Sequence, residues 1–188
     1  KPQEKSKGAK ERVTDFYGCD WERVPDKDLY FNQVSYPLEK YSVLSDCVQH
    51  IRTPDWNTYT NILHQDLNSQ LESIHGYCCI ADRNTAGFTE NSLRIRGYEN
   101  WYMDTIMDTK GVELLLDRIL EDKIRYWDVL IDWAKHNKCQ EQIDVISECD
   151  DLGSQSSTII GPDDLRKMVI PRIKELFSHI KKRLPGAK

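Results

Sequence analysis

The chain has 188 residues, of which 30% are charged and 39% hydrophobic, and its net charge is −5. This length allows one domain with a substantial core, and the charge provides no basic field for nucleic acid. No apolar run approaches the roughly 18 residues of a membrane-spanning helix, so we expect no nucleic-acid or membrane partner. The six cysteines form no Cys-x-x-Cys pair, which predicts free thiols in a cytoplasmic protein.

The N-terminal part of the chain shows no sustained hydrophobic period. Residues 1–12 are locally basic and are interpreted as a flexible linker. Residues 13–54 are rich in Tyr, Trp, Pro and Asp, and we expect irregular structure there. A short hairpin is predicted between Asp15–Trp21 and Tyr30–Val34.

Regular elements are predicted from residue 53 onward. Thr53-Pro54-Asp55 is a typical helix start, and the helix is expected to end near Ser73. His75–Ala81 is a short apolar run that predicts a buried strand. Phe88–Ile95 and Tyr98–Met107 are predicted to form two short helices, separated by Gly97.

The strongest helical pattern covers Lys110–His136 and precedes a second strand at Gln142–Ser147. A further helix begins at Gly161-Pro162-Asp163 and runs to Arg183, with a kink or break at Pro171. Strands separated by long helices predict an α/β fold with a parallel sheet. On the long helix, one face is apolar and the other carries charged residues that we interpret as solvated: Glu113, Asp117, Arg118, Glu121, Asp122 and Lys123.

Acidic residues follow both predicted strands. Asp150 and Asp151 end the second strand, and function in parallel α/β folds gathers at the carboxyl ends of strands. The alternative is that such an acid only caps a turn or a helix N-terminus. After the first strand, Asp82–Glu90 leads into a helix, where Glu90 and Arg94 could also form a simple surface pair.

The sequence offers no strong metal motif. The candidate ligands do not match a zinc spacing, so buried structural cysteines are the interpretation that we favour, and no metal ligand is assigned in this chain. The residues considered are His75, Cys78, Cys79, His136 and Cys139.

Four groups of short motifs occur in order along residues 13–183. They are Asp15–Glu22; Tyr36-Pro37-Leu38 with Thr53-Pro54-Asp55; Gly87–Glu90 with Arg96–Asn100 and Met103-Asp104; and Asp150–Gln155 with Gly161-Pro162 and Ile170–Arg172. Together they resemble the uroporphyrinogen decarboxylase superfamily, and Asp150-Asp-Leu-Gly153 is more similar to its cobalamin-dependent methyltransferase branch.

This resemblance implies a (β/α)8 TIM barrel, of which residues 13–188 would form the central part. The start at Lys1 without methionine also suggests a partial chain. The implied activity is corrinoid-linked transfer of a methyl group between a small substrate and cobalamin, with the cobalamin on a partner protein. The alternatives are a uroporphyrinogen decarboxylase of heme biosynthesis and an inactive fragment that assembles with another chain, including a second copy of itself.

The resemblance also implies roles for individual residues. Asp151 would be the catalytic residue at the barrel mouth. Asp150, Glu90, Asn100 and Gln155 would bind substrate or cofactor. Zinc is expected from sequence that follows Lys188, so this chain alone would not form the metal site.

Overall fold

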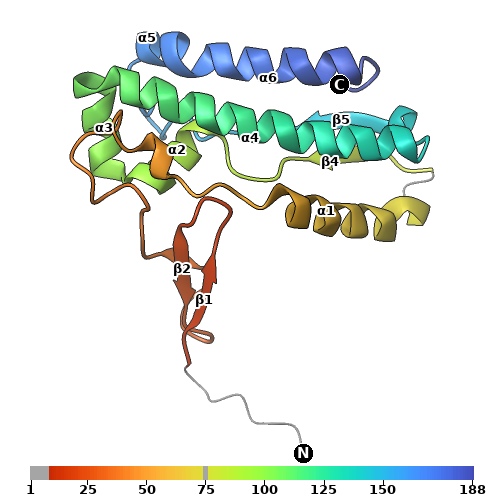
Figure 1. The fold of residues 1–188 in the computed structure, drawn as a ribbon, viewed down its shortest axis with the longest axis horizontal. Coiled ribbons are helices and arrows are strands. Elements are labelled where there is room, and N and C mark those ends of the chain that lie inside the picture. Colours follow the sequence, from red (N-terminus) through yellow and green to blue (C-terminus); the bar gives the residue numbers. More distant parts are fainter. Residues whose placement is uncertain (1–8, 74–75) are drawn as a thin grey trace, which may run out of the picture.

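The computed structural model describes residues 9–73 and 76–188, without the side chain of Glu72. Figure 1 shows a helical body that covers a small parallel sheet, and a β-arm that projects from this body. Of the predicted linker and the first strand, residues 1–8 and His75 lie outside the described residues.

The arm is a three-stranded antiparallel sheet in the order β1 (Glu11–Thr14), β2 (Asp20–Arg23) and β3 (Asn32–Gln33). Between β1 and β2, the Asp15 carboxylate accepts hydrogen bonds from the backbone N–H of Tyr17 and Cys19, at 3.0 and 2.9 Å. The hairpin predicted from Asp15–Trp21 and Tyr30–Val34 corresponds to the β2–β3 pair, in which Trp21 faces Gln33. The additional strand β1 was not predicted, and it includes Glu11 and Arg12, so the prediction of a flexible linker does not hold for these two residues.

Charged side chains hold the arm together. Arg12 pairs with Asp20 at 2.8 Å, and Arg23 pairs with Glu11 at 2.6 Å across the β1–β2 ladder. The Thr14 hydroxyl and the Arg12 guanidinium lower the pKa of Asp20 to about 2. Because β1 has only exposed residues, its order depends on these cross-strand pairs rather than on burial.

The body begins with α1 (Trp56–Gln70), whose N-terminus is capped by the Asp55 side chain, and continues through a 3-10 turn at Leu71–Ser73. Another 3-10 turn, at Val48–His50, precedes α1. The first parallel strand, β4, spans Cys79–Asp82, which is shorter and later than the predicted run from His75.

Three helices then connect the two parallel strands. They are α2 (Phe88–Arg96), α3 (Tyr98–Met107) and α4 (Thr109–His136). Gly97, at a φ of +85°, separates α2 from α3 in a conformation that glycine adopts without steric cost. The prediction is confirmed for all three helices, to within one residue at each end.

After a 3-10 turn at Gln140–Gln142, β5 (Ile143–Ser147) pairs with β4 in parallel. A single helical turn, α5 (Pro162–Asp164), leads into a π-helical segment over Leu165–Val169.

The last helix, α6 (Ile170–Arg183), follows the π segment. The expected break at Pro171 therefore takes the form of a π segment directly before α6. Pro171 lies in the first turn of α6, where a missing N–H is tolerated.

The sheet has two strands, and the backbone of Lys188 lies beside β5. Lys188 N donates to Asp144 O at 2.7 Å, and Ile146 N donates to Lys188 O at 2.9 Å, which is the pattern of a parallel bridge. Within residues 9–73 and 76–188, β4 pairs with β5 alone. The α/β prediction is confirmed, whereas these strands do not close a barrel.

The core lies between the sheet and the apolar face of α4. Fully buried residues of α4 include Leu115, Ile119, Trp127 and Ile131. The predicted solvated face of α4 is wrong at two positions, because Asp122 and Lys123 are buried. Among the described residues, no helix is both long and apolar enough to cross a membrane.

Candidate functional site

Polar side chains gather where β4 ends and α2 begins. A hollow of about 240 Å³ lies there, and we call it the mouth pocket. Two arginines, two carboxylates and two further polar side chains face it, so its lining is almost wholly polar. The lining residues are Asp82, Arg83, Asn84, Thr85, Ala86, Glu90 and Arg94.

Glu90 lies in the first turn of α2 and pairs with Arg94, one turn later. The sequence left open whether this would be a plain surface pair. Both side chains are about 30% exposed and line the mouth pocket, and the Arg94 guanidinium lies 5.0 Å from the centre of the Trp21 ring. Trp21 belongs to β2, so the arm helps to fix this wall of the pocket.

Asp150 binds the N-terminus of α2. Its carboxylate accepts hydrogen bonds from the backbone N–H of Thr89 at 2.8 Å and of Glu90 at 3.1 Å. The N-cap residue itself is Gly87, which has no side chain to do this. A Cβ atom at Gly87 would lie 2.2 Å from the Asp150 carboxyl carbon, so glycine is required for this approach. Asp150 thus joins the end of β5 to the wall of the mouth pocket.

Asp151 is exposed directly after Asp150, and its backbone N–H donates to the Asp150 carboxylate at 2.9 Å. The chain then forms a small hairpin-like loop, in which Gly153 bridges Thr158. Gln155 lies exposed in this loop. Asp151 thus follows the residue that contacts α2, Gln155 lies further along the loop after β5, and neither lines the mouth pocket.

Asn100 lies apart from this group. Its side-chain amide donates to Glu39 O at 3.0 Å, and it lines a different hollow together with Tyr36 and Tyr98. Asn100 thus attaches α3 to the segment before α1. Its expected role in ligand binding stays a prediction.

Buried polar and charged side chains of α4 hold the strand ends that form the site. They were not predicted from the sequence. Lys123 is fully buried, and its ammonium group pairs with Glu148 at 2.7 Å, one residue beyond β5. Trp127 Nε1 donates to the other Glu148 oxygen at 2.8 Å. The Tyr126 hydroxyl donates to Asp82 O at 2.6 Å, so α4 holds the ends of both strands. On a helix with charges at many positions, sequence alone did not separate Lys123 from its exposed neighbours.

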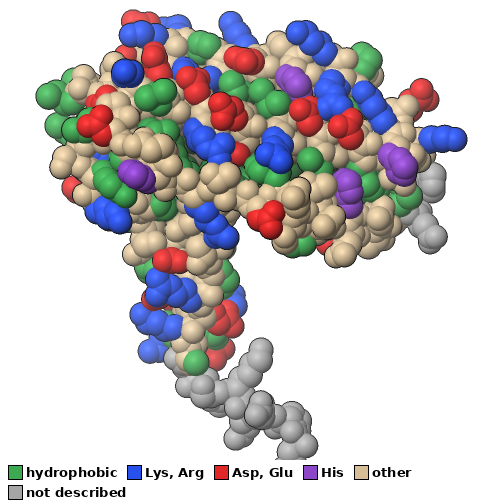
Figure 2. All heavy atoms as spheres, in the orientation of Figure 1, with side chains coloured by type: hydrophobic (Ala, Val, Ile, Leu, Met, Phe, Trp, Pro, Cys, Tyr) green, Lys and Arg blue, Asp and Glu red, His purple; other side chains and the backbone are tan. Residues whose placement is uncertain are grey.

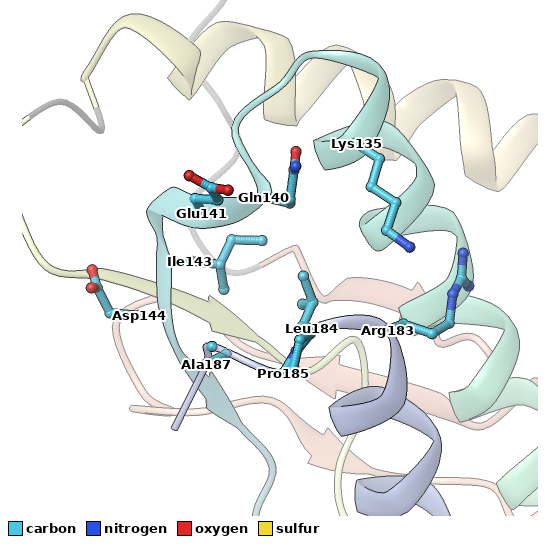
Figure 3. Close-up of a pocket in the computed structure, with 10 residues that line it drawn as sticks. Lys135, Gln140, Glu141, Ile143, Asp144, Arg183, Leu184, Pro185 and Ala187 are labelled. Carbon is cyan, nitrogen blue, oxygen red and sulfur yellow. The ribbon is translucent and has the colours of Figure 1, made fainter.

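A larger hollow of about 460 Å³ lies at the amino end of β5, between the ends of α4 and α6 (Figure 3). Lys135 and Arg183 lie on one side, while Glu141 and Asp144 lie on the other. Arg183 already pairs with Asp128 and Asp132. Because active sites of α/β folds form at the carboxyl ends of the strands, we place the candidate site at the mouth pocket.

The described residues do not provide a zinc site. Across residues 9–73 and 76–188, no three His, Cys, Asp or Glu side chains gather closely enough to hold a metal ion. All six cysteines are free thiols, as predicted. We therefore derive no step through zinc from this chain.

No protein-family profile and no curated protein sequence matches this chain. Among solved structures, a methyltransferase from Methanosarcina mazei matches with a TM-score of 0.53 and 18% sequence identity. The chain is similar in fold to a methyltransferase. The match covers 87% of this chain and 44% of that protein, so the chain spans less than half the length of this neighbour.

Proposed function

We propose that this protein is a methyltransferase that uses the carboxyl ends of β4 and β5 to bind a small polar substrate. The observation that supports this most directly is the mouth pocket, in which Arg83, Glu90 and Arg94 converge at a strand end. The fold likeness to a methyltransferase points to the same reaction class. The sequence resemblance adds the finer proposal, which is a corrinoid as the other methyl carrier.

The size and charge of the mouth pocket define the substrate. Pockets for drug-sized ligands have about 300–1,000 Å³, whereas the mouth pocket has about 240 Å³. Two guanidinium groups and two carboxylates line it, which suits a small molecule with polar or charged groups. A tetrapyrrole macrocycle exceeds this volume, so the mouth pocket would hold the small substrate, and the corrin ring would stay outside it.

The residues of this chain have separate tasks in the proposal. Glu90 and Arg94 hold the polar groups of the substrate, and Asp150 fixes the start of α2 that carries Glu90. Asp151, exposed beside them, orients the substrate or the incoming corrinoid. Gln155 adds a hydrogen-bonding side chain on the loop that follows β5.

The direct test uses full-length protein with methylcobalamin as a stand-in for the corrinoid of a partner protein. A thiol is added as acceptor, and the loss of methylcobalamin absorbance is followed together with formation of the methyl thioether. We expect protein-dependent methyl transfer. Conversion of uroporphyrinogen to coproporphyrinogen by the same preparation, with no methyl transfer, would contradict the proposal.

A further inference from the structure

The outer face of α3 is apolar although it faces solvent. Tyr102, Met103, Ile106 and Met107 are 38, 60, 77 and 76% exposed. We call these four residues the α3 stripe. The inner face of α3, in contrast, is partly polar. It buries Asp104 and Thr105 beside Trp101. Isolated exposed apolar residues are normal, whereas a continuous stripe along one helix indicates a contact surface.

The inner face of α3 carries polar groups that already have hydrogen-bond partners. The α3 stripe is therefore not a core-facing surface that has been turned toward solvent. The buried guanidinium of Arg96 pairs with Asp104 at 2.6 Å and donates to Leu38 O and Tyr41 O, at 2.6 and 2.7 Å. This network fixes the rotation of α3 about its axis. In Figure 2, hydrophobic side chains lie at the left-hand edge of the molecule, where Figure 1 places α3.

Two opposite charges flank the α3 stripe. Glu99 is the exposed charge of α3 itself, and Lys110 is exposed just beyond its other end, in the first turn of α4. Within the described part of the chain, neither side chain has an ion-pair partner. An antiparallel twofold pairing of α3 with α3 of a second copy matches Met103 with Ile106 and Tyr102 with Met107. The same register brings Glu99 of each copy toward Lys110 of the other.

We propose that the α3 stripe is an isologous interface between two copies of this protein. A twofold interface must be self-complementary, because each residue meets its counterpart twice. The stripe satisfies this condition with an apolar centre and one acidic and one basic end. The interface is independent of the proposed methyl transfer, since none of its residues lines the mouth pocket.

Sedimentation velocity of the full-length protein, over a range of concentrations, tests the interface. We expect the wild type to be a dimer and Met103→Glu to be largely monomeric, because this change buries two like charges near the twofold axis. Ile62→Glu is the matched control, since Ile62 is 53% exposed on α1 and should leave the dimer intact. A wild type that is monomeric at all concentrations would overturn the proposal. The α3 stripe would then be covered by another segment of the protein or by another protein.

A charge exchange tests the register and does not depend on disrupting the apolar centre. Glu99→Lys and Lys110→Glu alone should each raise the dimer dissociation constant by about tenfold, which corresponds to ~1.4 kcal/mol. The double variant should return close to the wild-type constant. Single variants that dimerise like the wild type, or a double variant that is no better than either, would overturn the proposed pairing. Unchanged melting temperatures would show that all variants fold.

Discussion

At the scale of single residues, two neighbouring acids at the end of β5 have different surroundings. The carboxylate of Asp150 binds two backbone N–H groups of α2, which is a capping interaction across 60 residues of sequence. Asp151 is exposed, so its side chain is accessible to a ligand. The sequence left both possibilities open for the pair, and the structure shows the capping contacts for Asp150.

This difference predicts separate effects on stability. Asp150→Ala should lower the free energy of unfolding by about 1–2 kcal/mol, as loss of a helix cap does. Asp151→Ala is the matched control and should change it by less than about 0.5 kcal/mol. Urea denaturation of both variants measures the difference. Equal losses would show that Asp150 does not serve as the cap.

Asp122 predicts a dependence of stability on pH. Burial raises its pKa, while Arg118, whose guanidinium lies 3.0 Å from its carboxylate, works against this rise. A carboxyl group whose pKa is raised in the folded state stabilises the fold at pH values below its pKa in the unfolded state, about 3.9. This contribution is lost as the pH rises through the pKa of the folded state.

The free energy of unfolding of wild type and Asp122→Asn, measured from pH 4 to pH 7, tests this sign. Relative to the variant, the wild type should lose stability as pH rises, because the variant cannot ionise at this position. A difference that stays constant, or that favours the wild type increasingly at higher pH, would contradict the assignment.

At the scale of elements, the sequence predicted helices better than strands. The stripe of apolar residues over Lys110–His136 locates α4 because its period of 3.6 extends over many turns. The strand β1 has no buried residue and no alternation, so its cross-strand ion pairs were not visible in the sequence. The π segment before α6 was predicted only as a break at Pro171.

The start of α4 predicts the effect of one added methyl group. A Cβ atom at Gly111 would lie 2.5 Å from Ser45 N and 2.6 Å from an Asp108 carboxylate oxygen. Gly111→Ala should therefore lower the free energy of unfolding by about 1–3 kcal/mol, the range for overpacked sites. Gly186→Ala, with no atom within 4 Å, is the control and should change little. Equal stability of the two variants in urea would contradict this packing.

At the scale of the whole molecule, the order of strands and helices predicted the α/β class, and the fold likeness agrees with it. The candidate site was predicted in part, because the rule for strand ends needs only the order of elements. This rule selected Glu90 and Asp150, which the structure brings into contact, and their roles in binding stay predictions. Arg83 and Asn84 lie within the segment singled out after the first strand, but no spacing marked them. Lys123 was missed because its burial depends on how α4 packs on β5.

The central claim is methyl transfer at the carboxyl ends of β4 and β5, and variant kinetics test it most directly. The measurement is kcat/KM for methyl transfer by full-length Glu90→Gln and Asp151→Asn. Asp66→Asn, an exposed acid on α1, is the control. We expect each site variant to lose about 10²-fold, within the usual range for acid–base and positioning groups, with the control unchanged. Site variants that fold normally and transfer methyl groups at the wild-type rate would contradict the account.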